Sequence, residues 1–221
     1  MKKSSEAELL KTTILWDHDG VLVETEPLFY EATRLKLADL GITLRKDDYL
    51  RDMAHGISAW ERVAAAGIPV DEIRIHKTHR NEIYQGFLQH NEIEIDGVEN
   101  VLEQLGKDYA MAIVTTSRKA DFDLIHRDRN ICKHMSFVLA NGDYKRKKPH
   151  PDPYLTALER FGASKNETVV VEDSERGLKA AVAAGIDCVV VENDFVRGQD
   201  LSAATHRIES LSMLADLLRE M

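Results

Sequence analysis

The stretch ILWDHDGVLVETEP, residues 14–27, places two carboxylates directly after a short apolar run. Asp17 and Asp19 flank a single histidine, and Gly20 follows at once. A short apolar run that ends in polar residues is typical of a strand buried on both faces of a parallel sheet. Because ligands bind beyond the carboxyl ends of such strands, this stretch predicts both a strand at 13–16 and the position of a site.

Further apolar runs of the same kind follow at residues 110–115, 137–140, 169–171 and 188–191. Segments of helical period separate most of them. This alternation of strand and helix predicts a doubly wound parallel sheet, that is, a Rossmann-type α/β fold.

Two of the separating helices have clear start signals. Asp152, followed by a proline, predicts one N-terminus, and Ser174 predicts another, whose helix ends at Gly185. The residues expected on the inner faces are Leu155 and Leu158 in the first helix, and Leu178, Ala181 and Val182 in the second. Leucines at 211, 214 and 217 predict one more helix in the tail.

No strand pattern appears between about residues 25 and 92, where helix signals dominate. Helices are predicted to begin near Thr25, near Ser58 and after Pro69. The chain is therefore expected to divide into an α/β core of residues 1–24 and 95–221 and an all-helical insertion of residues 25–94.

Composition excludes several classes of partner. The formal net charge of −9, from 38 acids against 29 bases, argues against a nucleic acid. No apolar stretch approaches the roughly 20 residues of a membrane span. The N-terminal stretch MKKSSEAELLKTT lacks the apolar region of a signal peptide, and Cys132 and Cys188 do not suggest a disulfide framework. A cytoplasmic protein without a membrane partner is expected, and its oligomeric state stays open.

Three of the expected strands end in residues that carry chemistry. The first ends at Asp17 and Asp19, the second at Thr115, Thr116 and Ser117, and the fourth at Glu172-Asp173. If the topology is correct, these side chains converge. Several carboxylates in one place repel one another unless a cation lies among them, and hard oxygen ligands suit Mg²⁺, which also binds substrate phosphate.

Each of these signals has a simpler explanation when it is taken alone. Asp-x-Asp-Gly is common in turns, Thr115 can cap a helix, and acids before Ser174 favour the helix dipole. An EF-hand is excluded, because Val21 and Leu22 occupy positions that need a ligand and a glycine. The joint occurrence of these polar residues at three strand ends favours a functional site.

Together the motifs resemble those of the haloacid dehalogenase superfamily of aspartate-nucleophile phosphotransferases. The first motif is met by Asp17-His18-Asp19-Gly20, the second by Thr115, and the third by Lys148 in KKPHPDPY, with Lys145 as the alternative if the alignment is shifted. The fourth motif is met by the acidic pair in VVVEDSERGLKAAVAAG. The helical insertion resembles the mobile cap of the subgroup that contains β-phosphoglucomutase and phosphoglycolate phosphatase.

The resemblance implies a role for each motif residue. Asp17 would attack phosphorus and form an aspartyl-phosphate, and Asp19 would act as general acid and then base, neutral when attack begins. Thr115 and the amide of Thr116 would bind phosphoryl oxygens, and Lys148 would neutralise them. The implied Mg²⁺ ligands are Asp17, the backbone carbonyl of Asp19, Asp173, and Glu172 either directly or through water.

The resemblance implies a phosphatase for a small phosphorylated metabolite, with a phosphomutase as the alternative. His55, and Trp60 beside it in MAHGISAWERV, are weaker candidates for substrate contact, as is Arg118. The mutase pattern would have a lysine where His55 stands, which favours hydrolysis. Dehalogenase activity is not expected, since dehalogenating members lack the second aspartate. A phospho-accepting signalling domain and a non-catalytic binding protein are the remaining alternatives, and the physiological substrate stays open.

Overall fold

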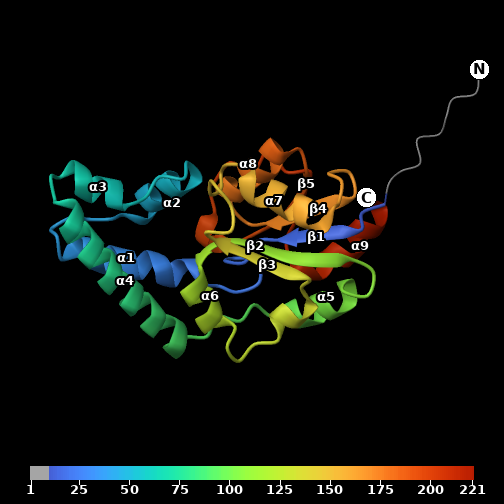
Figure 1. Cartoon of the computed structure of the whole chain (residues 1–221), viewed down its shortest axis with the longest axis horizontal. Coiled ribbons are helices and arrows are strands. Elements are labelled where there is room, and N and C mark those ends of the chain that lie inside the picture. Colours follow the sequence, from blue (N-terminus) through green and yellow to red (C-terminus); the bar gives the residue numbers. More distant parts are fainter. Residues whose placement is uncertain (1–9) are drawn as a thin grey trace, which may run out of the picture.

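Six parallel strands form the centre of the computed structural model, which describes residues 10–221 (Figure 1). Their order across the sheet is β3-β2-β1-β4-β5-β6. The strands are β1 (Thr13–Trp16), β2 (Ala110–Arg118), β3 (Phe137–Asn141), β4 (Thr168–Glu172), β5 (Asp187–Val191) and β6 (His206–Ile208). The predicted doubly wound parallel sheet is confirmed, and so are the five predicted strands.

The sequence analysis missed β6 and underestimated the length of β2. The three residues of β6 include two exposed polar side chains, so the strand gives no apolar run. Backbone pairing with β5 holds β6 at the edge of the sheet. In β2 the pairing with β3 is irregular between Val114 and Arg118, and the polar residues of this irregular part hide the strand from a pattern search.

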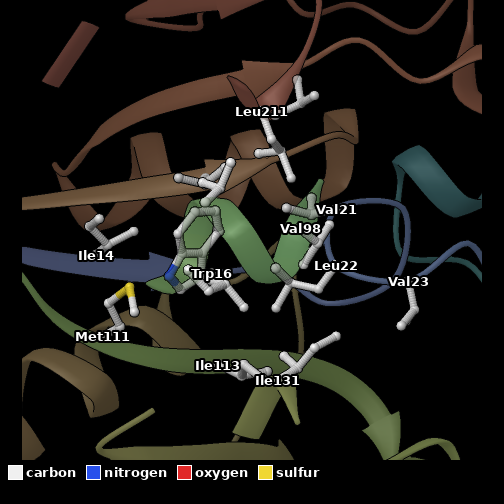
Figure 2. Close-up of a cluster of buried hydrophobic side chains, with 14 of the residues drawn as sticks. Ile14, Trp16, Val21, Leu22, Val23, Val98, Met111, Ile113, Ile131 and Leu211 are labelled. Atoms are coloured by element: carbon white, nitrogen blue, oxygen red, sulfur yellow. The ribbon is translucent and has the colours of Figure 1, made fainter. Parts of the chain in front are cut away.

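Alternate residues of each central strand face opposite sides of the sheet, as strand geometry requires. Ile14 and Trp16 belong to one buried cluster, and Leu15 between them belongs to another. The first cluster packs against α5 (Val98–Leu105), α6 (Lys119–Ile125) and α9 (Leu214–Glu220). Figure 2 shows part of this cluster, with Trp16 of β1 and Val98 of α5. The second packs against α7 (Asp152–Phe161) and α8 (Glu175–Ala184). Helices thus cover both faces of the sheet (Figure 1).

Within the described part of the chain, the regular elements of the insertion are helices, apart from an isolated bridge at Glu94. The helices are α1 (Glu26–Ala38), α2 (Lys46–Ala54), α3 (Trp60–Ala65) and α4 (Val70–His90), which lie together beside one end of the sheet (Figure 1). A third buried cluster, which includes Leu37, Tyr49 and Trp60, joins α1, α2 and α3. The sequence analysis did not identify α2, because its nine residues carry five charges and only a narrow apolar stripe.

The chain enters and leaves the insertion through two segments that are hydrogen-bonded to each other. The amide of Glu24 donates to the carbonyl of Ile93 at 2.8 Å, and Val23 forms an antiparallel bridge with Glu94. The connection between the insertion and the sheet is therefore two-stranded.

Some expected helix features are wrong. Asp152 is the first residue of α7 rather than its cap, and its carboxylate binds Arg146 at 2.8 Å. Leu155 and Val182 are exposed rather than turned inward, because a helix packed flat on a sheet buries only a narrow stripe. Ser174 does cap α8, where its hydroxyl accepts from the amide of Gly177 at 3.2 Å. Gly185 ends that helix with φ +72°.

The expectation that the chain has no signal peptide concerns its N-terminal stretch, of which residues 1–9 lie outside the described residues. Among residues 10–221, no helix is long and apolar enough to cross a membrane. Both cysteines are free.

Truncation of one buried and one exposed leucine tests this packing. Leu102 on α5 is fully buried, whereas Leu155 on α7 is 38% exposed. We expect Leu102→Ala to lower the free energy of unfolding by about 2–5 kcal/mol, because it leaves a cavity. Leu155→Ala should change it by less than about 0.5 kcal/mol. Urea unfolding measures both, and equal losses would contradict the placement of α7.

Candidate active site

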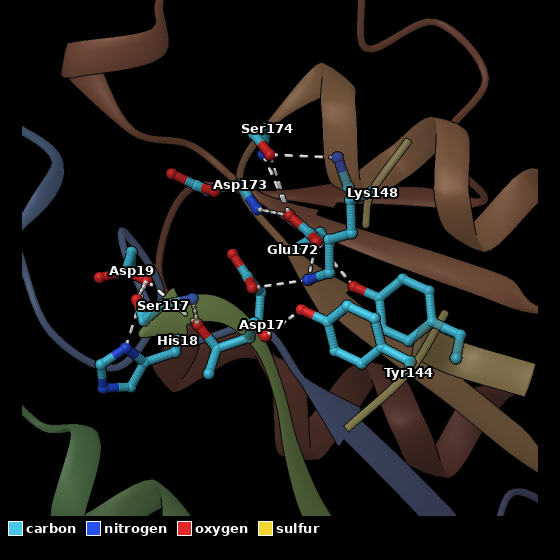
Figure 3. Close-up of polar contacts among 12 residues, drawn as sticks. Asp17, His18, Asp19, Ser117, Tyr144, Lys148, Glu172, Asp173 and Ser174 are labelled. Atoms are coloured by element: carbon cyan, nitrogen blue, oxygen red, sulfur yellow. Dashed lines mark hydrogen bonds and ion pairs between the residues drawn. The ribbon is translucent and has the colours of Figure 1, made fainter. Parts of the chain in front are cut away.

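The predicted site residues meet at the carboxyl edge of the sheet because β2, β1 and β4 are neighbours in that order. Asp17 follows β1, and its amide donates to the carbonyl of Val171 at 2.8 Å, which ties the two strand ends together. Thr115 lies in β2 and Glu172 ends β4. Figure 3 shows the side chains of Asp17, Glu172 and Asp173 close to one another at this edge.

Lys148 lies between two of the acids, although it comes from the loop between β3 and α7. Its Nζ donates to Asp17 Oδ1 at 2.6 Å and to Glu172 Oε1 at 2.7 Å, and the residue is almost fully buried (Figure 3). Burial alone would lower the pKa of this lysine, but the two carboxylates outweigh burial and raise it. Lys148 therefore stays charged, and the alternative Lys145 is exposed.

Glu172 has every acceptor position occupied. Its Oε1 accepts from Lys148 and from the hydroxyl of Tyr154 at 2.6 Å. Its Oε2 accepts from the amides of Asp173 and Ser174 and from the Ser174 hydroxyl, at 3.2–3.4 Å. Although burial opposes ionisation, Lys148 and these donors lower the pKa of Glu172. Glu172 thus works as a fixed counter-charge that positions Lys148.

The carboxylate of Asp173 is also buried, but it accepts fewer hydrogen bonds than that of Glu172. Asn193 Nδ2 donates to its Oδ2 at 3.0 Å. Burial, with Glu172 and Asp17 close by, raises the pKa of Asp173 well above its usual range. Gly20, at φ +87°, makes room for this carboxylate, since a Cβ there would lie 2.0 Å from Asp173 Oδ2. The first motif therefore requires glycine at position 20 for two reasons: the positive φ, and the space that a side chain would take from Asp173.

Asp17, Glu172 and Asp173 offer carboxylate oxygens that all lie within 4.8 Å of one another. Burial and Glu172 raise the pKa of Asp17 to about 6, against the opposing effect of Lys148. One lysine thus leaves the buried acids with uncompensated negative charge. A hard divalent cation that prefers oxygen ligands fits this donor set.

Asp19 points away from these acids, toward donors of its own (Figure 3). Ser117 donates to its Oδ2 at 2.6 Å, Thr115 donates to the same oxygen at 3.2 Å, and Thr25 donates to its Oδ1. His18 Nδ1 lies 3.3 Å from Oδ2. Burial alone would raise the pKa of Asp19, but His18 and the hydroxyl donors lower it. In this arrangement Asp19 is a carboxylate.

The irregular part of β2 sets the orientation of the second motif. Thr115 Oγ1 also accepts from the amide of Ser117 at 3.0 Å, and the carbonyl of Thr115 accepts from Tyr144 at 2.6 Å. Thr116 lines an adjacent cavity. An irregularity of this kind redirects side chains at a strand end. Here it brings the hydroxyls of Thr115 and Ser117 to Asp19.

A cavity of about 360 Å³ opens beside these residues, between the helical insertion and the sheet edge. Asp19, Thr116, Lys148 and Trp60 are among its lining residues. Arg118 also lines it, but its guanidinium binds both oxygens of Asp121, at 2.6 and 2.8 Å.

His55 is not among the residues that line the cavity. It is exposed, and its Nδ1 lies 2.8 Å from the carbonyl of Arg51. Among residues 10–221, His55 forms no hydrogen bond with a residue of the four motifs, and its one side-chain hydrogen bond is to Arg51.

Sequence reasoning missed several residues that shape the site. Asn193 follows β5 at the same sheet edge, so its position after a strand was a usable signal. Ser117 lay within the second motif but was not assigned to Asp19. Tyr154 and Arg176 lie on helices, at positions where no local pattern distinguishes a site residue from a packed or exposed one.

Residues 14–191 match the family of haloacid dehalogenase-like hydrolases. The chain belongs to this family. The resemblance drawn from the four motifs is confirmed, and the chain is a hydrolase.

Two relatives and one solved structure show the extent of the similarity. Protein CbbY of Rhodobacter capsulatus is 28% identical over 215 residues, which cover 91% of this chain and 94% of that protein. Fructose-1-phosphate phosphatase YqaB of Escherichia coli is 28% identical over 182 residues, 80% of this chain and 95% of that one. The crystal structure of CbbY from Rhodobacter sphaeroides in complex with phosphate shares the fold, with a TM-score of 0.77 at 24% identity over 93% of this chain and 96% of that chain.

The fixed position of Glu172 in this haloacid dehalogenase-like hydrolase predicts that Gly177 tolerates no side chain. A Cβ at Gly177 would lie 1.7 Å from Glu172 Oε1, and Glu172 cannot move without losing its donors. Gly177→Ala should therefore cost more than about 3 kcal/mol of unfolding free energy. Gly86→Ala in α4 is the matched control, because its Cβ would meet nothing within 4 Å. It should stabilise the protein by about 0.5–1 kcal/mol. Urea unfolding of both variants measures this, and a neutral Gly177→Ala would contradict the account of Glu172.

The uncompensated charge at Asp173 predicts a pH dependence. A carboxyl whose pKa is raised on folding stabilises the fold at low pH, and this contribution is lost as pH rises toward the folded pKa. In EDTA, Asp173→Asn should therefore gain stability relative to the wild type between pH 5 and pH 8, seen as a rise in relative Tm. In Mg²⁺ we expect the order to reverse, because the variant offers a divalent cation one carboxylate fewer. Asp128→Asn, at an exposed site, should show neither trend. A wild type unaffected by both pH and Mg²⁺ would contradict the prediction.

Proposed function

We propose that this hydrolase is a Mg²⁺-dependent phosphatase that cleaves a small phosphorylated sugar or a related phosphomonoester. The observation that carries the proposal is the buried arrangement of Lys148 between Asp17 and Glu172, with Asp173 beside them. It provides a nucleophile, a fixed cation and a place for a metal in one pocket. The family match and the names of relatives such as fructose-1-phosphate phosphatase support a phosphoric monoester as substrate.

Asp17 and Asp173 are the carboxylates that would hold the metal, together with the backbone carbonyl of Asp19. Glu172 offers an oxygen at the right separation, but both of its oxygens already accept hydrogen bonds, so we assign it the support of Lys148. When bound, Mg²⁺ would shield the incoming phosphoryl group from the carboxylates and stabilise charge that develops on it.

In the first step we assign Asp17 as the nucleophile. One carboxylate oxygen of Asp17 attacks phosphorus, and the bond between phosphorus and the ester oxygen breaks. Lys148 holds Asp17 in place and compensates charge on the phosphoryl oxygens, while Thr115 and the amide of Thr116 bind those oxygens. The leaving alcohol takes a proton from Asp19.

In the second step Asp19 acts as a base. It takes a proton from water, the water oxygen attacks phosphorus, and the bond to Asp17 breaks to release phosphate. Asp19 must therefore carry a proton when attack begins, whereas its present donors favour the carboxylate. The negative charge of a bound phosphate would favour protonation, since a like charge nearby raises the pKa of an acid.

The helical insertion, residues 25–94, is proposed to act as a cap that excludes water during the reaction. Its α2–α3 loop already meets the core near Lys148: a Cβ at Gly56 would lie 2.7 Å from Cδ of Pro149. Exclusion of water strengthens each electrostatic contact in the pocket and protects the phosphoenzyme from premature loss.

Replacement of the two motif aspartates tests the mechanism. We expect Asp17→Asn to lower kcat by more than 10⁴-fold, because no nucleophile remains, and Asp19→Asn to lower it by about 10²–10⁴-fold. Phosphate release from fructose 1-phosphate, with Mg²⁺ and with EDTA, measures both. EDTA should abolish wild-type turnover, and Asp128→Asn is the control for loss of one exposed acid.

Two results would contradict this assignment. Full activity of Asp17→Asn would exclude the aspartyl-phosphate. A hexose phosphate isomer formed in place of free phosphate, detected by chromatography over a panel of sugar phosphates, would show a phosphomutase instead.

A further inference from the structure

Two histidines beside Asp19 have no part in the proposed chemistry. His18 separates the two aspartates of the first motif and is fully buried, and His126 follows the last residue of α6. We propose that both are positioning residues for Asp19: His126 fixes the ring of His18, and His18 fixes one oxygen of the Asp19 carboxylate. The inference rests on the proposed phosphatase function, in which Asp19 delivers a proton to the leaving alcohol.

The two imidazole rings are joined by a hydrogen bond between their Nε2 atoms, which lie 2.8 Å apart. Phe122, one turn before His126, packs against both rings, with its centroid 4.9 Å from that of His18 and 4.3 Å from that of His126. The amide of His126 donates to the carbonyl of Phe122 at 3.0 Å, at the C-terminal end of the helix. Helix α6 therefore holds the His126 ring in a fixed place beside the residues that follow β1.

A polar pair is unfavourable in this part of the core. Phe122 and Ile125 belong to the buried apolar cluster around Trp16, and Nδ1 of His126 is buried without a hydrogen-bond partner in the described part of the chain. An apolar side chain of similar size would fill the same space and leave no unpaired polar atom. Packing alone does not explain two histidines at these positions, which favours a role in the adjacent site.

The hydrogen bond between the rings requires one Nε2 to donate and the other to accept. Burial lowers the pKa of His126 to about 3, so this ring is uncharged at neutral pH and carries one proton. On Nδ1 that proton would form a buried N–H without an acceptor, which native structures avoid more strictly than an unpaired acceptor. His126 is therefore the donor, and Nε2 of His18 is the acceptor.

An uncharged imidazole that accepts at Nε2 carries its own proton on Nδ1. In His18 this nitrogen lies 3.3 Å from Oδ2 of Asp19 (Figure 3). It is buried and makes no well-aligned hydrogen bond with any residue between 10 and 221, so the carboxylate of Asp19 is the acceptor within its reach. The donors thus follow one another from His126 to His18 to Asp19. A partner at one ring nitrogen sets the tautomer, and with it the bond that the other nitrogen makes.

The hydroxyl donors of Asp19 do not replace His18. Ser117 and Thr115 donate to the same oxygen, Oδ2, and Thr25 donates to Oδ1. A hydroxyl can rotate and can also accept, so it fits either form of a carboxyl oxygen, whereas the Nδ1–H of His18 can only donate. His18 therefore keeps Oδ2 as an acceptor, and Oδ1 is the oxygen that carries the proton for the leaving alcohol.

The histidine pair gives up no proton during turnover. Asp19 passes its proton to the alcohol in the first step and takes one from water in the second, so the reaction balances without a further donor. The two rings act through the orientation of one carboxylate. Loss of either ring should therefore impair proton transfer to the leaving group and leave the binding of the phosphoryl group intact.

The dependence on the leaving group tests this role in the full-length enzyme with Mg²⁺. The alcohol of a sugar phosphate needs a proton as it leaves, whereas 4-nitrophenolate leaves p-nitrophenyl phosphate without one. We expect His126→Leu to lower kcat/KM by about 10-fold or more for the sugar phosphate that the wild type cleaves fastest, and by less than about 3-fold for p-nitrophenyl phosphate. Only steps up to the phosphoenzyme enter kcat/KM, so the second step does not affect the comparison.

A conservative variant and two controls complete the series. In His126→Gln the side-chain amide can still donate to His18, and kcat/KM should stay within about 3-fold of the wild type for both esters. His79→Leu, at an exposed position of α4, is the matched control for loss of one imidazole and should show no selectivity. Asp19→Asn gives the full effect, a larger loss with the same selectivity.

Two further measurements do not depend on activity. In ¹⁵N NMR spectra at neutral pH, His18 should carry a proton on Nδ1, and His126 should carry its proton on Nε2. Thermal unfolding should place the Tm of His126→Leu at or above that of the wild type, because the variant removes a buried nitrogen without a partner. A purely structural pair predicts the opposite, a lower Tm and equal losses on both esters.

The outcomes separate this inference from the proposed function. Unchanged kcat/KM for both esters in His126→Leu, equal losses on both, or a proton on Nδ1 of His126 would each overturn the inference and leave the phosphatase intact. An equal loss on both esters in Asp19→Asn would remove Asp19 as the general acid and overturn the proposed mechanism. No hydrolysis of any ester would overturn the proposed function, and this inference with it.

Discussion

A single buried ammonium group determines the arrangement of the acids at the carboxyl edge of the sheet. Lys148 contacts Asp17 and Glu172 at hydrogen-bond distance, and Asp173 lies beside them without a cation of its own. Carboxylates this close together in a dry environment repel strongly, so the fold must supply either a counter-charge or a proton for each. Lys148 supplies one, and backbone and hydroxyl donors stabilise Glu172. The remaining negative charge, on oxygen donors, fits a hard divalent cation.

The sequence was sufficient to predict most of the core. Parallel strands buried on both faces give continuous apolar runs. The residues that follow these strands lie at the same edge of the sheet, and the paths of the connecting loops do not change this. The sequence therefore predicts that Asp17, Thr115 and Glu172 lie close together. Lys148 was found through its motif, because it reaches the strand ends from a loop whose path no local pattern predicts.

The parts that escaped prediction depend on tertiary geometry. Strand β6 is held by pairing with β5 rather than by apolar side chains, and α2 has too few apolar residues to show a periodic stripe. Asn193 and Arg176 act only because the chain brings them to Asp173 and to the cavity. The helical period of the sequence predicts which side of α7 faces the sheet, and Leu155 lies near that side. It does not predict how many residues on either side of the buried stripe are covered, and Leu155 is left exposed.

The paired segments that join the insertion to the sheet restrict how the two parts can move. A single peptide linker permits rotation about many axes, whereas two linkers that share the hydrogen bond between Glu24 and Ile93 resist twisting and permit bending about one line. Opening of the cavity would then follow an arc, in which Arg80 of α4 departs from Arg176 of α8 and returns to the same position. A reproducible path of this kind would let the two walls of the pocket recover the same alignment after each opening.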